Sequence, residues 1–149
     1  MSVDAATKRM RHDPLTPAQR SYAMAQVKAK DTSTEMRVRS LVHQMGYRFR
    51  LHRGDLPGKP DLAFPSRRKV IFVHGCFWHG HHCRAGRKRP KSNEDYWLPK
   101  LQRNAARDQQ DRVRLRRMGW TSLVIWECEV AKIEALRRKV VRFLEAREA

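Results

Sequence analysis

Residues able to do chemistry are concentrated in one stretch, Val70 to Cys83, which reads VIFVHGCFWHGHHC. Within eight positions it holds five potential metal ligands, and one more cysteine follows far downstream: Cys76, His79, His81, His82, Cys83 and Cys128. Thiolates with imidazole are a ligand set that suits tetrahedral Zn²⁺. We therefore expect a structural zinc site of three cysteines and one histidine. The spacing does not choose the histidine, and reduced core cysteines near surface histidines are the alternative.

A second candidate is an acidic residue placed opposite that stretch. Asp61 opens a strand expected at 61–64, and a second strand at 70–73 follows a tight turn. A hairpin would bring Asp61 beside the Val73–His74 end. A carboxylate with a neighbouring main-chain carbonyl suits Mg²⁺ holding a phosphodiester. This geometry resembles the PD-(D/E)xK nucleases, although Val73 and His74 replace the usual acid and lysine. The alternative is a simple turn residue after Pro60.

Three more residues have both a chemical and a structural interpretation. His74 and His79 could act as general acid or base because imidazole titrates near neutrality, but a histidine at a strand end can be merely structural. Glu35 follows Thr32 at the spacing of a capping box, which is enough to explain it.

Large aromatic residues accompany these groups. Phe77 and Trp78 are adjacent, and Trp97 follows the basic run at 84–91. Such rings can wedge between base steps or stack on bases. Ordinary core packing is the alternative.

The composition points to a polyanionic partner. Lys and Arg number 33 against 15 Asp and Glu, a formal net charge of +18 over 149 residues. Nucleic acid is the commonest such partner, with a ribosome-associated protein or a basic surface selected for solubility as alternatives. An odd cysteine count, no apolar leader in the first residues and no long apolar run predict a soluble, reduced, cytoplasmic protein.

The elements that must position these residues can be outlined from periodicity and breakers. We expect a flexible basic arm over 1–15 and a single domain over 16–149. Helices are expected at 16–28, 32–46, 101–118 and 131–145, and strands at 47–51, 61–64, 70–73 and 121–126, with an exposed loop at 84–91. This order predicts an α/β fold with a mixed sheet flanked by helices.

The whole set resembles the very-short-patch repair (Vsr) endonucleases, from about Ser21 to Glu129. Seven segments carry the resemblance: MAQVKAKDTSTE at 24–35, LPGKPD at 56–61, Val70 to Cys83, Tyr96-Trp97, NAARD at 104–108, Gly119-Trp120 and VIWEC at 124–128. The resemblance implies a restriction-endonuclease-like fold, structural zinc and a Mg²⁺-dependent active site. It implies nicking of one strand 5′ to the thymine of a T:G mismatch, the product of 5-methylcytosine deamination.

The resemblance also assigns residues. Asp61 and the Val73 main-chain carbonyl would bind Mg²⁺, although many relatives have threonine where Val73 stands. His74, His79 and Glu35 match active-site residues. The zinc ligands would be Cys76, His81, Cys83 and Cys128, which leaves His82 without a role. Phe77, Trp78 and Trp97 match the aromatic wedge, and Met24 approaches the DNA from the other groove.

Partners follow from the same resemblance. They are double-stranded DNA with a T:G mismatch, a cytosine-5 methyltransferase linked by function, and a mismatch-repair accessory protein, with no membrane contact and a monomeric enzyme. Two other functions remain open. A catalytically inactive zinc-stabilised DNA-binding protein would not need Asp61, His74 and His79 together. A restriction-type endonuclease on matched DNA would not need the aromatic wedge.

Overall fold

The computed structural model describes residues 32–87 and 94–147. Four strands form one mixed sheet in the order β1-β2-β3-β4: β1 (Arg50–Leu51), β2 (Leu62–Phe64), β3 (Lys69–His74) and β4 (Thr121–Trp126). β1, β2 and β3 pair antiparallel, whereas β3 and β4 run parallel. The expected mixed sheet flanked by helices is confirmed.

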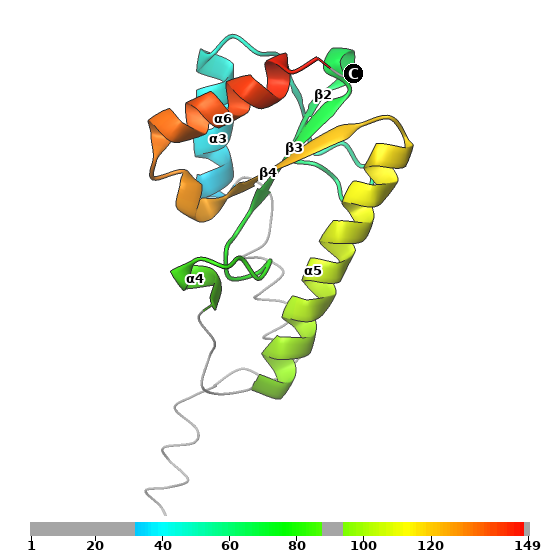
Figure 1. The fold of residues 1–149 in the computed structure, drawn as a ribbon, viewed down its shortest axis with the longest axis vertical. Coiled ribbons are helices and arrows are strands. Elements are labelled where there is room, and N and C mark those ends of the chain that lie inside the picture. The colour runs from blue at the N-terminus through cyan, green and yellow to red at the C-terminus, as the bar shows by residue number, and fades with distance from the viewer. Residues whose placement is uncertain (1–31, 88–93, 148–149) are drawn as a thin grey trace, which may run out of the picture. The chain divides into compact units, whose positions relative to one another are not determined.

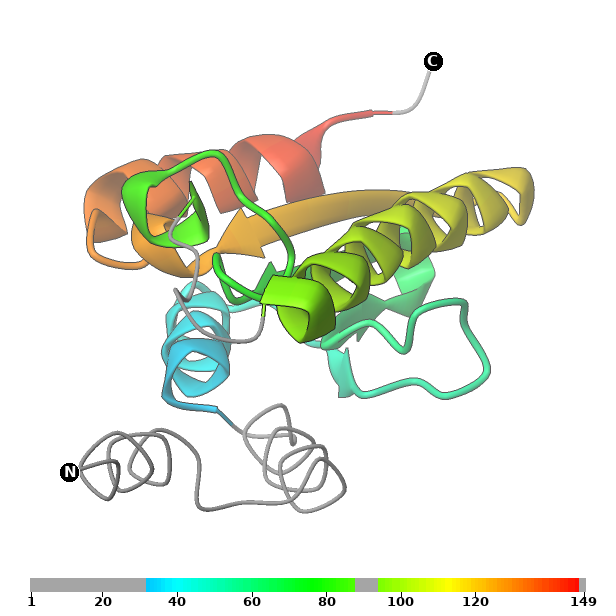
Figure 2. The ribbon, with the colours of Figure 1, turned by 90° about the horizontal axis from the view of Figure 1, so that it is seen from below.

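Helices cover both faces of this sheet (Figure 1). α3 (Ser33–Gln44) and α6 (Ile133–Glu145) cover one face, where Val38, Leu62 and Val140 belong to one buried apolar cluster. α5 (Glu94–Arg117) lies along the other face, where Leu115 packs with Val70 and Phe72. Figure 2 shows the sheet between α6 and α3 on one side and α5 on the other. β3 is buried almost throughout because both of its faces are covered.

Two expected boundaries differ clearly from the structure. The strand expected at 47–51 is reduced to Arg50–Leu51, since its partner β2 ends at Phe64 before Pro65, which has no N–H to pair. Phe49 still packs edge-on against Phe64, with ring centroids 6.2 Å apart. α5 begins at Glu94 rather than Leu101, because Pro99 stands close to the helix start and removes only one main-chain hydrogen bond there.

The basic stretch at 84–91 is not wholly a loop. α4 (Arg84–Arg87) forms one helical turn, closed by a 2.9 Å bond from the Arg87 N–H to the Cys83 carbonyl. Residues 88–91 lie outside the described part, as do the arm at 1–15, the helix expected at 16–28 and Met24. Among the described residues, none of the helices combines the length and apolar character needed to cross a membrane.

Candidate active site and metal sites

Strand pairing explains why the chemical groups meet at one edge of the sheet. β3 and β4 are parallel and end together, with His74 paired to Trp126. Two residues beyond each strand stand Cys76 and Cys128, and the Cys128 N–H donates to the Cys76 Sγ at 3.4 Å. β2 runs antiparallel and therefore starts at this edge, directly after Asp61.

The first group is a cysteine and histidine cluster. Its members are Cys76, His81, Cys83 and Cys128, whose ligand atoms all lie within 4.8 Å of one another. His81 Nδ1 is 3.6 Å from the Cys128 Sγ. Burial and neighbouring thiols raise the pKa of Cys76 to about 12, whereas a hydrogen bond with His81 lowers the pKa of Cys83 to about 6. Thiols this close ionise together only beside a cation, so the donor set fits a closed zinc site.

The loop that carries this cluster is held by main-chain contacts. The His81 N–H donates to the Cys76 carbonyl at 3.0 Å, and the Gly86 N–H reaches the Cys83 Sγ at 3.4 Å. Gly86 is buried, and a Cβ added there would collide with the main-chain carbonyl of His81. Position 86 therefore requires glycine for α4 to close over the cluster.

The second group combines His74 and His79 with an aspartate from α5. The two imidazoles stack with centroids 3.8 Å apart and planes 4° apart. His79 Nδ1 is hydrogen-bonded to the Asp108 carboxylate. Burial opposes ionisation of Asp108, but the hydrogen bond and charge of His79 outweigh it and lower its pKa. The three ligand atoms lie close enough to share one ion or one proton relay.

His74 is the buried member of this pair. Burial and the neighbouring His79 lower the pKa of His74 to about 3, so its ring is neutral at physiological pH. Its Nδ1 atom is buried and has no hydrogen-bond partner within residues 32–87 and 94–147. A buried nitrogen without a hydrogen-bond partner is a candidate to bind a substrate, a water molecule or an ion.

Helix α5 holds both the loop backbone and the His79 side chain in place. Asn104 lies one turn before Asp108 on the same helix face and is 4% exposed. Its amide donates to the Trp78 carbonyl at 3.0 Å. Asn104 therefore holds the backbone of the loop while Asp108 holds the His79 side chain.

Trp126 connects the two histidine sets. Its indole stacks on His81 of the cysteine cluster, with centroids 4.2 Å apart and planes 21° apart. The same ring meets His74 edge-on at 5.3 Å and His79 at 6.5 Å. One rigid side chain thus sets the spacing between the candidate zinc site and the histidine pair.

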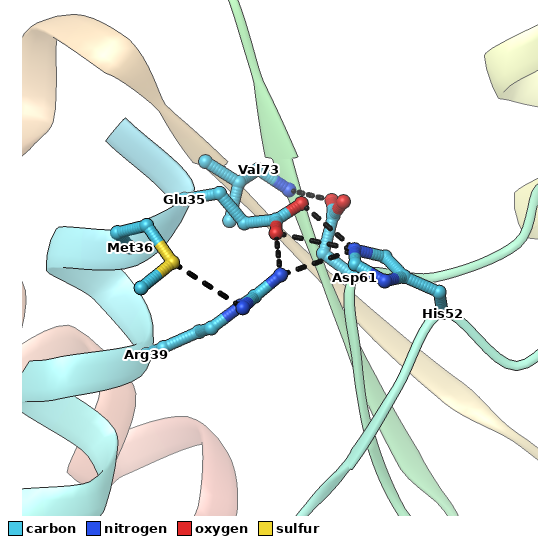
Figure 3. Close-up of polar contacts among 6 residues, drawn as sticks. All are labelled: Glu35, Met36, Arg39, His52, Asp61 and Val73. Carbon is cyan, nitrogen blue, oxygen red and sulfur yellow. Dashed lines mark hydrogen bonds and ion pairs between the residues drawn. The ribbon is translucent and has the colours of Figure 1, made fainter. Parts of the chain in front are cut away.

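The third group surrounds Asp61 (Figure 3). The Val73 N–H donates to Asp61 Oδ2 at 2.6 Å, which joins Asp61 to the strand that ends in His74. Glu35, from the first turn of α3, is 4% exposed and forms an ion pair with Arg39. Both Glu35 oxygens lie 3.1 Å from His52 Nε2. These contacts give the Glu35 carboxylate more partners than a capping box supplies.

The two carboxyl groups shift each other's pKa in opposite directions. Burial and the nearby Glu35 carboxylate raise the pKa of Asp61 to about 8. Burial also disfavours ionised Glu35, but hydrogen bonds from Asp61 and His52 and the charge of Arg39 outweigh it and lower its pKa. Asp61 is therefore the protonated partner at neutral pH, and a divalent ion would replace that proton.

The predicted wedge residues form a cluster of their own. Ring centroids are 5.0 Å apart for Phe77 and Trp78, 5.8 Å for Phe77 and Trp97, and 5.5 Å for Trp78 and Trp97. Trp97 is only 8% exposed, whereas the other two are half-buried. His82 packs against His81 at 4.2 Å and is otherwise exposed.

The structure places Asp61 beside the Val73–His74 end of β3, as the expected hairpin predicted, with Glu35 next to Asp61 and His79 next to His74. The roles of these residues stay predictions. Sequence reasoning missed five residues that complete these groups: Arg39, His52, Asn104, Asp108 and Trp126. The spacing of Asn104 and Asp108, four residues apart on a polar helix, was an available signal for a shared helix face.

Comparison with known proteins identifies relatives of this chain. The family model described as DNA mismatch endonuclease Vsr matches residues 12–85. The chain is 54% identical to the Type II nicking enzyme V.XorIIP of Xanthomonas oryzae pv. oryzae over 133 residues, which cover 89% of this chain and 97% of that protein. It is 42% identical to the DNA mismatch endonuclease Vsr of Escherichia coli K12 over 84% of this chain and 78% of that one.

A structural match supports the fold. The catalytic domain of the homing endonuclease I-Bth0305I superposes with a TM-score of 0.54 at 18% identity, covering 76% of this chain and 94% of that domain. The mixed sheet and this match support a restriction-endonuclease-like α/β fold.

Proposed function

The chain belongs to the Vsr family of DNA mismatch endonucleases, and we propose that it nicks one strand 5′ to the thymine of a T:G mismatch. One observation carries the proposal. Val73 connects two acid–base groups at one sheet edge, since its N–H bonds Asp61 and the next residue, His74, stacks on the Asp108-bonded His79. A DNA-binding protein without catalysis has no need of this arrangement.

The histidine group has the parts of a general base. When the Nδ1–H of His79 donates to Asp108, its Nε2 lone pair is left to take a proton from water. His74 stays neutral beside it and can donate a hydrogen bond to the scissile phosphate or accept one from a water molecule. Asp108 fixes the tautomer and orientation of His79.

The carboxylate group fits a magnesium site. Asp61, Glu35 and the Val73 carbonyl would hold Mg²⁺, which when bound supplies positive charge that stabilises the phosphodiester in its transition state. Cys76, His81, Cys83 and Cys128 would hold a structural Zn²⁺ that fixes the loop carrying His79 and the aromatic rings.

DNA recognition would combine charge and stacking. The net charge of +18 binds phosphates without reading sequence. A mismatched pair is easier to open by about a few kcal/mol, so insertion of Phe77 and Trp78 selects the lesion. Trp97 is buried in the aromatic cluster and would have to move to reach a base. Met24 would approach from the opposite groove.

The biological setting follows from the reaction. Such a nick starts very-short-patch repair of deaminated 5-methylcytosine, so the enzyme would act alongside a cytosine-5 methyltransferase and a mismatch-repair accessory protein. It would act as a cytoplasmic monomer.

The deciding experiment is a nicking assay with Mg²⁺ on matched and T:G duplexes of otherwise identical sequence. Selective nicking of the T:G strand is expected, and Asp61→Ala should abolish it while leaving DNA binding largely intact. Equal cutting of matched DNA would identify a restriction-type enzyme. Binding without any cutting would identify an inactive zinc-stabilised DNA-binding protein.

A further inference from the structure

His52 occupies an unusual place beside the carboxylate group. It follows β1 with a φ of +47°, in the left-handed region that residues other than glycine rarely adopt. Its N–H donates to the Asp61 carbonyl at 3.3 Å. Such conformations are strained and cluster at functional sites. The strained backbone turns the imidazole of His52 toward Glu35 rather than toward solvent (Figure 3).

The distances within this group are those of atoms that share a metal ion. Two ligands at right angles, each about 2.1 Å from an ion, are about 3.0 Å apart. His52 Nε2 lies 3.1 Å from Glu35 Oε1 and 3.1 Å from Oε2. The ligand atoms of Glu35, His52 and Asp61 all lie within 4.8 Å of one another.

The positively charged guanidinium of Arg39 already lies beside Glu35 and His52. An Arg39 nitrogen contacts the Glu35 carboxylate and lies 3.3 Å from His52 Nε2. Nε2 therefore lies where a cation and a carboxylate meet, and it is one of the two imidazole nitrogens that can bind a metal ion. The Arg39 side chain, on α3, is 13% exposed and would have to move for an ion to take its place.

We propose that His52 is a third side-chain ligand of the divalent ion, forming a mixed carboxylate–imidazole site with Glu35 and Asp61. This inference deepens the proposed nuclease function and rests on it. An imidazole nitrogen is a softer ligand than the oxygens that Mg²⁺ prefers, and Mn²⁺ accepts it more readily. The site should therefore bind Mn²⁺ more tightly than Mg²⁺ by a margin that depends on His52.

The test measures Mn²⁺ binding to the full zinc-loaded chain without DNA, by electron paramagnetic resonance. We expect His52→Gln to weaken Mn²⁺ binding about tenfold. Mg²⁺ affinity, measured by competition, should fall less than threefold. His43→Gln is the matched control, because His43 is an exposed histidine in the last turn of α3. Asp61→Asn should remove Mn²⁺ binding altogether.

A spectroscopic measurement on the wild-type chain keeps the proposal testable even if the His52→Gln variant misfolds. Spin-echo modulation from a directly bound ¹⁴N nucleus should be present in the wild-type Mn²⁺ complex and absent in His52→Gln. Absence of ¹⁴N coupling in the wild type overturns the proposal, as does unchanged Mn²⁺ binding in His52→Gln. Failure of the wild type to nick T:G duplexes would instead refute the proposed function, whatever the Mn²⁺ result.

Discussion

Replacing Asp61 with asparagine should stabilise the fold while it removes the activity. The raised pKa of Asp61 predicts that this group is protonated at neutral pH and donates to Glu35, while it accepts from the Val73 N–H. Asparagine reproduces both contacts, because its amide donates and its carbonyl accepts, and it needs no proton. The wild-type carboxyl group must instead take up a proton when the chain folds at neutral pH.

The size of the effect follows from the raised pKa. The folded value of about 8 lies above the ordinary value of 3.8, so wild-type stability is lost as pH rises between them. Protonation at pH 7 costs about 1.4 kcal/mol for each unit above 3.8, which sets a ceiling of about 4 kcal/mol. Relaxation around a partly hydrated group reduces it, so we expect Asp61→Asn to gain about 2 kcal/mol at pH 7.

Urea unfolding of zinc-loaded protein without Mg²⁺ measures this gain. The gain should be near zero below about pH 4, rise with pH and level off above about pH 8. Asp55→Asn is the control, since Asp55 is exposed, pairs with Arg53 and has a lowered pKa. Added Mg²⁺ should stabilise the wild type alone. The prediction that Asp61 is protonated in the folded protein would be refuted by either of two results. One is an Asp61→Asn variant less stable than wild type at pH 8, and the other is a stability gain that does not change with pH.

Three other changes test the supporting residues. Asp108→Asn should lower the nicking rate about 100-fold with DNA affinity unchanged, because His79 loses the group that fixes its tautomer; an unaffected rate would remove Asp108 from the mechanism. Gly86→Ala should lower zinc content, since its Cβ meets the His81 carbonyl, whereas Gly54→Ala, which meets nothing, should retain zinc. Trp126→Leu should lower the nicking rate at full zinc occupancy, with Trp126→Phe partly restoring it. Trp120→Leu, on the apolar side under α5, should lower stability without changing the rate per folded molecule.

The parts of the site that the sequence predicts are those built from local order. Asp61, Val73 and His74 follow from a hairpin whose strands are adjacent in the chain, so alternation and turns are enough to place them. The cysteine cluster is partly local as well, with Cys76, His81 and Cys83 in one loop. The fold class follows from the order of elements for the same reason.

The residues that sequence reasoning missed depend on contacts between distant segments. Asp108 reaches His79 across 29 positions and His52 reaches Glu35 across 17, so no local pattern pairs either residue with its partner. The strand register decides such contacts, because a shift of one residue turns each side chain to the opposite face. His52 is further hidden by its left-handed backbone, which no periodic pattern reveals.

The register of β3 and β4 also explains why zinc and catalysis would be coupled in this fold. Parallel pairing of His74 with Trp126 puts Cys76 level with Cys128, so the same ladder that places the proposed catalytic histidine places two cluster cysteines. The Trp126 ring then lies between the histidine pair and the cysteine cluster, where it contacts His74, His79 and His81. A change at the cysteine cluster can reach His79 by two routes, through the loop backbone and through this indole. Loss of zinc should therefore misplace His79 before it unfolds the sheet, because the apolar core cluster under α3 and α6 contains no residue of the cysteine cluster.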